Sequence, residues 1–398
     1  MKYQPISFEP FFGWVNRSRV LYSPGVRKEL AYELSQLGAR NVMVYTDKGL
    51  SEAGIVEKIV QQISQSDLKL AGIFDNIQQD ARISNINDGA EHYRSSGADS
   101  MVVVGGGSVM DTAKAVNILV GSNLEDFMPL AEQAGLWEGA KPLPPHIAFP
   151  TTAGTGCEVT NAMVVLDVDS KTKLSVTHPF CNSDIAMLDP ELTTTLPPKI
   201  TAFTGMDALT HAIEGITSVG AEPISDALGL HAIRLISTFL PVAVERPEDL
   251  EARGAMLIAA TMAGMCFCNT MTGATHATAH ALGALYGIPH GIANAIMLPW
   301  VMEFNLEDSH QRYVMIADAL GVDIQSEDAI TAASKAAQAV RRLKESIGLN
   351  ETLKDFGVQP DSEQLAPLVE LAAGDGQISY NPRYVEESDL LMLFTKAI

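Results

Sequence analysis

The sequence predicts an α/β domain with a mostly parallel sheet over residues 1–195, followed by an all-α domain over residues 196–398. In the first part, short apolar runs alternate with stretches of helical periodicity, which is typical of a parallel sheet covered by helices. After Pro198 the strand patterns largely disappear, and Ala-, Leu- and Met-rich stretches from about 200 to 345 have the composition of packed helices. The active site of such a chain is expected in a cleft between the two domains.

Three apolar runs in the first domain are predicted as strands, and two stretches between them as helices. The predicted strands are residues 41–46, 68–74 and 100–104, and the predicted helices are about 52–65 and 82–96. A later pair of runs, 164–167 and 173–177, is joined by Asp-Ser-Lys-Thr and is predicted as a hairpin appended to the same sheet.

Composition excludes several classes of function. The formal charge of −21 disfavours binding to nucleic acid or to anionic membranes, because both require a cationic surface. The amino-terminal residues contain no apolar core of a secretory signal, and no stretch approaches 18 uninterrupted apolar residues, so no membrane span is expected. The cysteines form no CxxC motif, which predicts reduced thiols in a cytoplasmic protein. They are Cys157, Cys181, Cys266 and Cys268.

A glycine-rich turn follows the third predicted strand and reads Gly105-Gly-Gly-Ser108. Ser108 and Asp111 have the spacing of a capping box, so a helix is predicted to begin at Ser108. Glycines let the backbone approach a ligand closely, and a helix N-terminus offers N–H groups to an anion such as pyrophosphate. An ordinary tight turn would use the same residues, and the GxGxxG pattern of the usual dinucleotide-binding fold is absent.

Two other polar segments are candidates for cofactor contacts. Asp47 ends the first predicted strand, where a carboxylate can accept from a ribose 2′-hydroxyl and repel a 2′-phosphate, although acids there are also common helix caps. The loop 150–156 contains hydroxyl groups at Thr151, Thr152 and Thr155 that can bond ribose or phosphate. Thr155 has the alternative role of a plain cap for the next segment.

The second domain contains a candidate metal site. Asp207 and His211 have i,i+4 spacing, as have His276 and His280, and His290 follows ten residues later. Each pair therefore lies on one helix face, in a setting almost without charge. Neutral imidazoles with one carboxylate suit iron, zinc or manganese. A single such histidine is more often a hydrogen-bonded core residue, but the repeated spacing favours metal binding, and the HExxH pattern of zinc proteases is absent.

Five motifs together resemble the iron-containing (group III) alcohol dehydrogenases, over a stretch from about residue 15 to the carboxyl terminus. They are TDKGL, GGGSVMDTAKA, PTTAGTGCEVT, GMDALTHAIEG and HATAHALGALYGIPHGIANAIMLP. The resemblance implies an NAD-binding first domain, a second domain that holds one divalent metal, most simply iron, and a homodimer or larger homo-oligomer. The implied metal ligands are Asp207, His211, His276 and His290. The implied cofactor contacts are Asp47, Gly105, Gly106, Gly107, Ser108, Thr151, Thr152, Thr155 and Lys173.

One segment departs from the family pattern. Many members have Pro-Asn-Pro after the second strand, whereas this chain has Gln79-Asp80-Ala81. Asp80 is therefore the candidate for the contact that the asparagine makes near the nicotinamide.

The activity that the resemblance implies is reversible hydride transfer between NAD and a small primary alcohol or diol, with the metal as Lewis acid and His280 passing the released proton towards solvent. One alternative is a sugar-phosphate cyclase of the dehydroquinate synthase kind, which would need clustered cations for an anionic substrate. Between Thr201 and Trp300 the only cations are Arg234, Arg246 and Arg253. The other alternative is a non-catalytic nucleotide-binding protein. It would not explain an open coordination position on a metal next to a dinucleotide site.

Overall fold

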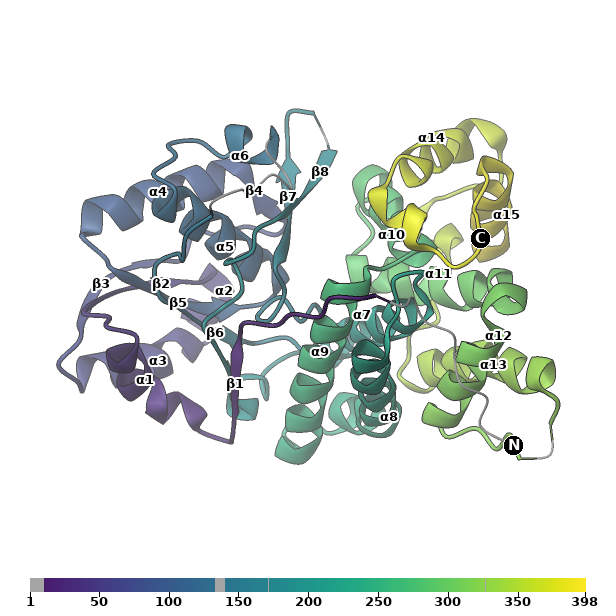
Figure 1. Ribbon diagram of the computed structural model, residues 1–398, viewed down its shortest axis with the longest axis horizontal. Helices are drawn as coiled ribbons and strands as arrows, with labels where there is room; N and C mark the ends of the chain where they lie inside the picture. Colours follow the sequence, from purple (N-terminus) through teal and green to yellow (C-terminus); the bar gives the residue numbers. More distant parts are fainter. Residues whose placement is uncertain (1–10, 133–139, 171, 326) are drawn as a thin grey trace. The chain divides into compact units, whose positions relative to one another are not determined.

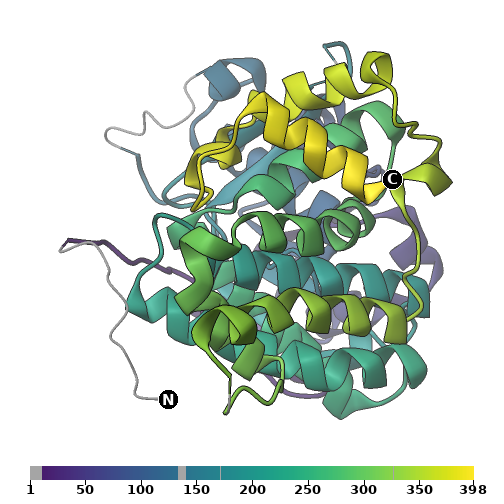
Figure 2. The same cartoon turned by 90° about the vertical axis from the view of Figure 1, so that its right-hand side faces the viewer.

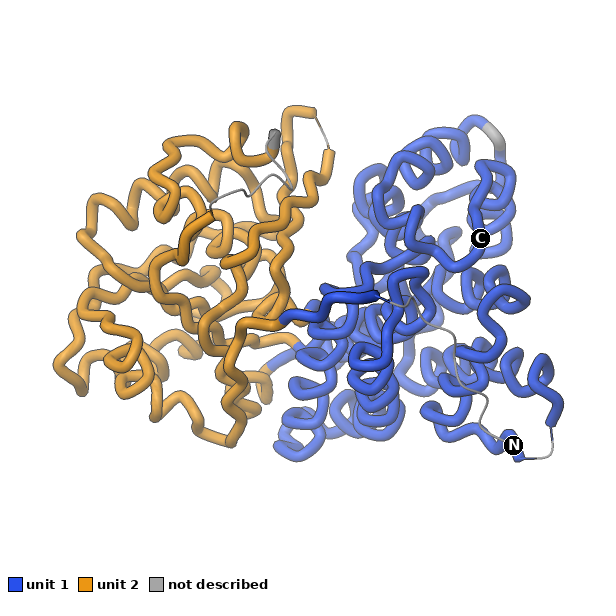
Figure 3. The backbone as a smooth tube through the Cα atoms, viewed as in Figure 1, with its two compact units in different colours: residues 1–15, 153–155, 196–398 blue, residues 16–152, 156–195 orange. Residues whose placement is uncertain are grey.

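The computed structural model describes residues 11–132, 140–170, 172–325 and 327–398, and the chain divides into two compact units (Figure 3). Unit 2 comprises Asn16–Thr152 and Gly156–Thr195, and unit 1 comprises Met1–Val15, Ala153–Thr155 and Leu196–Ile398. The predicted fold class is confirmed, because unit 2 is built on a parallel sheet and the regular structure of the described part of unit 1 is helical.

The main sheet of unit 2 has six strands, all paired in parallel, in the order β1-β9-β6-β5-β2-β3 (Figure 1). In that order the strands are Arg19–Tyr22, Ile185–Leu188, His146–Pro150, Ser100–Gly105, Asn41–Tyr45 and Lys69–Phe74. Parallel strands have their carboxyl ends at one edge of the sheet, so the glycine-rich turn after β5 and the residues after β2, β3 and β6 meet at that edge.

Helices cover both faces of this sheet, because alternate residues of a strand point to opposite sides. On β2, Val42 and Val44 pack with helices α1 and α3, whereas Met43 and Tyr45 pack with α4 and α5. The helices of unit 2 are α1 (Leu30–Gln36), α2 (Lys48–Glu52), α3 (Ile55–Ser64), α4 (Ile83–Ser96), α5 (Gly107–Gly121) and α6 (Met128–Glu132), with 3₁₀ turns at Val26–Glu29 and Pro190–Leu192.

The predicted hairpin exists but is not appended to the main sheet. Strands β7 (Ala162–Asp167) and β8 (Thr172–Thr177) are antiparallel, and β7 also pairs in parallel with the short β4 (Ala81–Arg82). They form a separate three-stranded sheet, so the predicted position was wrong. The reason is that the partner strand β4 has only two residues and carries no recognisable strand pattern.

Unit 1 is a stack of helices (Figure 2). Their buried apolar side chains form two cores. Helices α7, α8 and α9 contact one another in the first core, and α10, α11, α14 and α15 contribute to the second. The helices are α7 (Pro198–Thr217), α8 (Pro223–Glu245), α9 (Leu250–Thr270), α10 (Ala274–Tyr286), α11 (His290–Phe304), α12 (Leu306–Ala319), α13 (Ala329–Ser346), α14 (Ser362–Ala373) and α15 (Glu387–Ala397), with 3₁₀ turns at Leu353–Phe356 (η3) and Gly376–Tyr380 (η4).

Local chemistry determines where these helices begin. Pro198 starts α7 in the first turn, where its missing N–H costs nothing. The side chain of Asp249 caps α9 by accepting from the Ala252 amide at 3.0 Å, and Glu222 caps α8 by accepting from the amides of Ile224 and Ser225.

Helices α8 and α9 are long and apolar enough to cross a membrane by length and composition alone. In this structure α9 is mostly buried, and Ile233, Ile236 and Leu240 of α8 belong to the first core of unit 1. Core helices of a globular protein pass the same test, so the two helices are weak evidence for a membrane span.

Candidate metal centre and cofactor cradle

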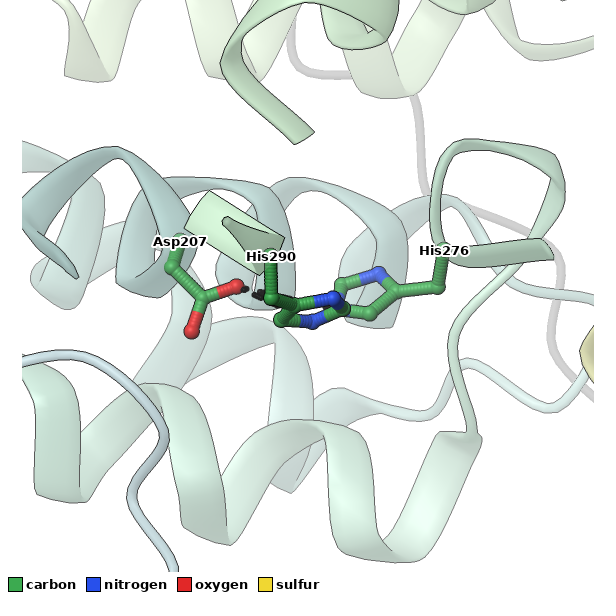
Figure 4. Close-up of side chains that lie close together, drawn as sticks. All are labelled: Asp207, His276 and His290. Atoms are coloured by element: carbon green, nitrogen blue, oxygen red, sulfur yellow. Dashed lines mark ion pairs between the residues drawn. The ribbon is translucent and has the colours of Figure 1, made fainter. Parts of the chain in front are cut away.

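Three side chains of the predicted metal site converge from three helices of unit 1 (Figure 4). Asp207 lies on α7, His276 on α10, and His290 is the first residue of α11. One ligand atom from each lies within 4.8 Å of the other two. Asp207 Oδ1 is 3.4 Å from His290 Nε2 and 4.0 Å from His276 Nε2. Ligand atoms about 2.1 Å from a tetrahedral metal are about 3.4 Å apart, so the spacing suits a first-row ion.

His211 lies beside this trio and not within it. Its Nδ1 is 3.9 Å from Asp207 Oδ2, and its ring centroid is 4.5 Å from that of His276. The ring stacks on Phe267 at 4.2 Å, with 15° between the planes. In the described part of the chain His211 Nδ1 is buried and has no hydrogen-bond partner. A buried polar atom without a partner costs free energy, and a bound metal would remove that cost, so the residues present fit the ion.

Glu214 orients His276, and the sequence analysis missed it. Its Oε2 lies 2.5 Å from His276 Nδ1, and its Oε1 accepts from the Thr275 amide at 2.6 Å. A carboxylate at Nδ1 takes the ring proton and leaves Nε2 free to coordinate. The available signal was the position of Glu214 on α7, seven residues or two turns after Asp207, which puts it on the same helix face.

Asn294 is the second missed residue. Its amide Nδ2 donates to Asp207 Oδ1 at 2.7 Å and lies 3.2 Å from His290 Nε2. The side chain is fully buried, so it holds the carboxylate in place next to His290. Its i,i+4 relation to His290 on α11 was the signal in the sequence.

The protonation of the site favours metal binding. Burial, reinforced by the charges that His211 and His280 can carry, holds the pKa of His276 well below its usual value, so the ring is neutral at pH 7 and able to coordinate. Burial also raises the pKa of the Glu214 carboxyl. Hydrogen bonds from the Thr275 side chain and from backbone amides lower this pKa, but by less than burial raises it.

His280 lies next to the trio and is bonded to a different carboxylate. Its ring stacks on His290 with centroids 5.3 Å apart, and its Nδ1 lies 2.7 Å from Asp375 Oδ2. Asp375 also caps η4 by accepting from the Gln377 amide. Burial alone would raise the pKa of Asp375, but the hydrogen bond and charge of His280 outweigh it and lower that pKa. His280 is about one-fifth exposed, so it remains open to solvent.

The three arginines of the segment between Thr201 and Trp300 have structural partners in unit 1. Arg253 donates to Thr201 Oγ1 and to two backbone carbonyls, while Arg234 pairs with Asp318 and Arg246 with Asp249. These contacts do not form the cation cluster that a phosphorylated substrate would require.

In unit 2 the glycine-rich turn forms a tight strand-to-helix junction. A Cβ on Gly105 would lie 2.4 Å from Val109 Cβ, and one on Gly106 would lie 3.1 Å from Thr152 Oγ1. Glycine at these two positions lets α5 begin directly after β5. The Thr151 amide donates to the Gly105 carbonyl at 3.0 Å, which ties the loop after β6 to this junction. Gly105, Gly106, Gly107, Ser108, Thr151 and Thr152 are therefore together, whereas Thr155 falls in the short segment that belongs to unit 1.

The predicted capping box at Ser108 and Asp111 was wrong. Helix α5 begins at Gly107, and its N-cap residue is Gly106. The helix start therefore has no side-chain capping hydrogen bond. Asp111 instead accepts from the Val164 amide of β7 at 3.0 Å and lies 3.9 Å from the ammonium of the buried Lys114. The tertiary contact with β7 therefore takes the carboxylate that the local pattern assigned to the helix start.

Asp47 has the capping role that the sequence left open. Its Oδ1 accepts from the Leu50 amide at 2.9 Å at the start of α2, and its backbone bridges to Asn76. The residue is only partly buried at the carboxyl end of β2. A cap uses one carboxylate oxygen, so this contact is compatible with a second contact to a ribose.

Lys173, on β8, forms an ion pair with Asp80 at 3.0 Å. The Asp80 amide donates to Ser108 Oγ at 3.1 Å. Two of the predicted cofactor contacts, Ser108 and Lys173, are thus joined through Asp80.

Comparison with known proteins assigns the chain to a family. Residues 17–190 match the family described as iron-containing alcohol dehydrogenase, and residues 201–398 match the carboxyl-terminal part of the Fe-containing alcohol dehydrogenase family. The chain is 34% identical to the NAD-dependent methanol dehydrogenase of Bacillus methanolicus, over 94% of this chain and 96% of the relative. It is 35% identical to the 1,3-propanediol dehydrogenase of Klebsiella pneumoniae, over the same shares.

A solved structure agrees with these sequence matches. The alcohol dehydrogenase from Oenococcus oeni superposes with a TM-score of 0.93 at 32% identity, over 98% of this chain and 100% of that chain. The chain therefore belongs to the iron-containing alcohol dehydrogenase family.

Proposed function

We propose that this protein catalyses the reversible transfer of a hydride between NAD and a small primary alcohol or diol, with the corresponding aldehyde as the other partner. The observation that carries the proposal is the convergence of Asp207, His276 and His290 within 4.8 Å, in a member of an iron-containing dehydrogenase family. The sugar-phosphate cyclase is not favoured, because the relatives are alcohol and diol dehydrogenases and the nearby arginines are occupied.

Asp207, His211, His276 and His290 would hold one divalent metal. Three imidazoles and one carboxylate leave the ion a net positive charge and a position for the substrate oxygen. A metal bound there would act as a Lewis acid on that oxygen, and iron is the ion that the family name indicates. Glu214 and Asn294 keep the ligand atoms oriented, so little reorganisation is needed when the ion enters.

His280 would move the proton released from the alcohol. Asp375 accepts the Nδ1 proton of His280, which leaves Nε2 able to take a proton from the substrate side. The partial exposure of His280 supports delivery of that proton to solvent. His280 therefore serves as a proton-transfer residue and not as a fifth ligand.

The cofactor is NAD, and we place its diphosphate at the amino-terminal turn of α5. Gly105, Gly106 and Gly107 carry no side chains, so the diphosphate can approach the backbone amides of this turn, and Ser108 adds a hydroxyl donor. Thr151, Thr152 and Lys173 are assigned to the same ligand, and Asp47 to the adenosine ribose. The cofactor contact of Thr155 stays a prediction from the sequence.

We also propose that the enzyme is a cytoplasmic homo-oligomer. None of the four cysteines forms a disulfide in this structure, which supports a reducing compartment. The homo-oligomer is the assembly that the resemblance to the iron-containing alcohol dehydrogenases implies. Light scattering of the purified protein would test the second point, and a monomeric mass would contradict it.

The test of function is NAD reduction with a panel of alcohols that includes methanol, 1-butanol, 1,2-propanediol and 1,3-propanediol, after the apoprotein has been loaded with Fe²⁺, Zn²⁺ or Mn²⁺ in turn. His290→Ala should remain folded, retain little metal by elemental analysis and lose nearly all turnover. His231→Ala, at an exposed position of α8, is the matched control and should behave as wild type. Full metal occupancy in His290→Ala would contradict the assignment, and the absence of NAD-linked activity with every alcohol and metal would contradict the function.

A further inference from the structure

Asp80 has an unusual backbone conformation. Its φ is +57°, in the left-handed region that residues other than glycine seldom adopt and that asparagine and aspartate tolerate best. The strain is maintained by contacts on both sides of the residue. The Asp80 amide donates to Ser108 Oγ at 3.1 Å, and Asp80 Oδ1 bonds the Lys173 ammonium at 3.0 Å. Backbone strain that the surroundings maintain in this way is a marker of functional positions.

The two bonds connect Asp80 to the amino-terminal turn of α5 and to β8. Ser108 is the second residue of α5, where the helix offers its partial positive charge. Since its Oγ accepts from Asp80, the Ser108 hydroxyl proton remains available to donate to an anion. Lys173 is the cation tied to the same residue, and its side chain is only about one-fifth exposed.

We infer that Asp80 neutralises most of the positive charge that Lys173 would present to the cofactor. The ammonium and the carboxylate then act on the diphosphate as one nearly neutral pair. This inference rests on the proposed NAD site at α5. An unpaired lysine would hold the doubly charged diphosphate more tightly, and an unpaired aspartate would repel it. The pair therefore restrains the affinity for NAD and favours release of the bound cofactor, a step that often limits turnover in dehydrogenases and other enzymes.

Asp80→Asn is the informative substitution because asparagine also tolerates a positive φ and retains the amide that bonds Ser108. Only the charge is removed. The measurement is the Kd for NAD⁺ of the purified full-length protein, by calorimetric titration at about 50 mM salt. For one unit charge several ångströms from the diphosphate at nearly aqueous screening, we expect Asp80→Asn to lower the Kd about threefold. The gain should shrink at about 500 mM salt.

The second arm uses Lys173→Met, alone and combined with Asp80→Asn. The single variant loses the cation and exposes the carboxylate, so its Kd should rise about tenfold. The double variant has the same net charge as wild type and should recover to within about threefold of the wild-type Kd. If Asp80 had a purely structural role, the double variant would not bind NAD⁺ better than Lys173→Met, because a second structural loss does not compensate for the first.

Asp67→Asn controls for net charge. Asp67 is exposed and precedes β3, at the opposite end of the sheet from Asp80, which follows the carboxyl end of that strand. This control should leave the Kd unchanged. Weaker NAD⁺ binding in Asp80→Asn, or a double variant no better than Lys173→Met, would overturn the inference. Undetectable NAD⁺ binding by the wild-type protein would overturn the proposed function itself, so the two failures are distinguishable.

Discussion

Replacing Glu214 with glutamine isolates the contribution of one buried carboxylate to the metal site. Glu214 contacts His276 Nδ1 at 2.5 Å and the Thr275 amide at 2.6 Å, and its side chain is almost completely buried. The glutamine has nearly the same shape, and its oxygen can retain one of these bonds. Its amide nitrogen then faces the other donor, and the charge is lost.

The magnitude follows from the type of bond that is removed. A hydrogen bond to a charged group contributes about 1.5–3 kcal/mol, and loss of a carboxylate that orients a ligating histidine weakens metal binding roughly 10–100-fold. These two ranges agree, since a factor of ten is about 1.4 kcal/mol. We therefore expect Glu214→Gln to raise the metal Kd by about one to two orders of magnitude, while His276 remains in place.

The assay is a titration of the apoprotein with Zn²⁺ or Co²⁺ against a chelator of known affinity, with circular dichroism to confirm folding. Glu222→Gln is the matched control. Glu222 is also a buried carboxylate of unit 1 that accepts two amide protons, both at 2.7 Å, but it caps α8. Its substitution should lower stability and leave the metal Kd unchanged. A folded Glu214→Gln protein with wild-type metal affinity would refute the reasoning.

Three more outcomes are expected. His280→Ala should keep its metal while turnover falls roughly 10²–10⁴-fold, and loss of metal from this variant would make His280 a ligand. The wild-type protein should prefer NAD over NADP by about 2–3 kcal/mol, measured as the ratio of the two kcat/KM values. Asp47→Asn keeps the cap of α2 but removes the charge, so it should make this ratio smaller. Burial, followed by the charge of Lys114, lowers the pKa of His146 to about 3. The unfolded chain therefore binds the extra proton below about pH 6.5, and stability is lost as the pH falls towards 3. Between pH 6 and pH 4 the free energy of unfolding should therefore fall by about 2 kcal/mol less in His146→Leu than in the wild-type protein. Denaturant titrations that show the same fall in both proteins would contradict this.

The sequence was sufficient for features that depend on local periodicity. Alternation of strands and helices before Pro198 predicted the parallel sheet, because that pattern reflects which residues must be buried. The i,i+4 spacing of Asp207 with His211 predicted that one helix face carries both side chains, and the lack of nearby charge indicated a metal. The structure then brought Asp207, His276 and His290 together from three helices.

The tertiary structure alone decided which partner each buried polar group has. Glu214 lies 62 residues before His276, and Asp375 lies 95 residues after His280, so no local pattern indicates either pair. Asp111 follows the same principle, because its carboxylate bonds β7 and not the helix start that its spacing predicted. A buried carboxylate must find a donor to offset its desolvation, and packing between distant segments determines which donor is within reach.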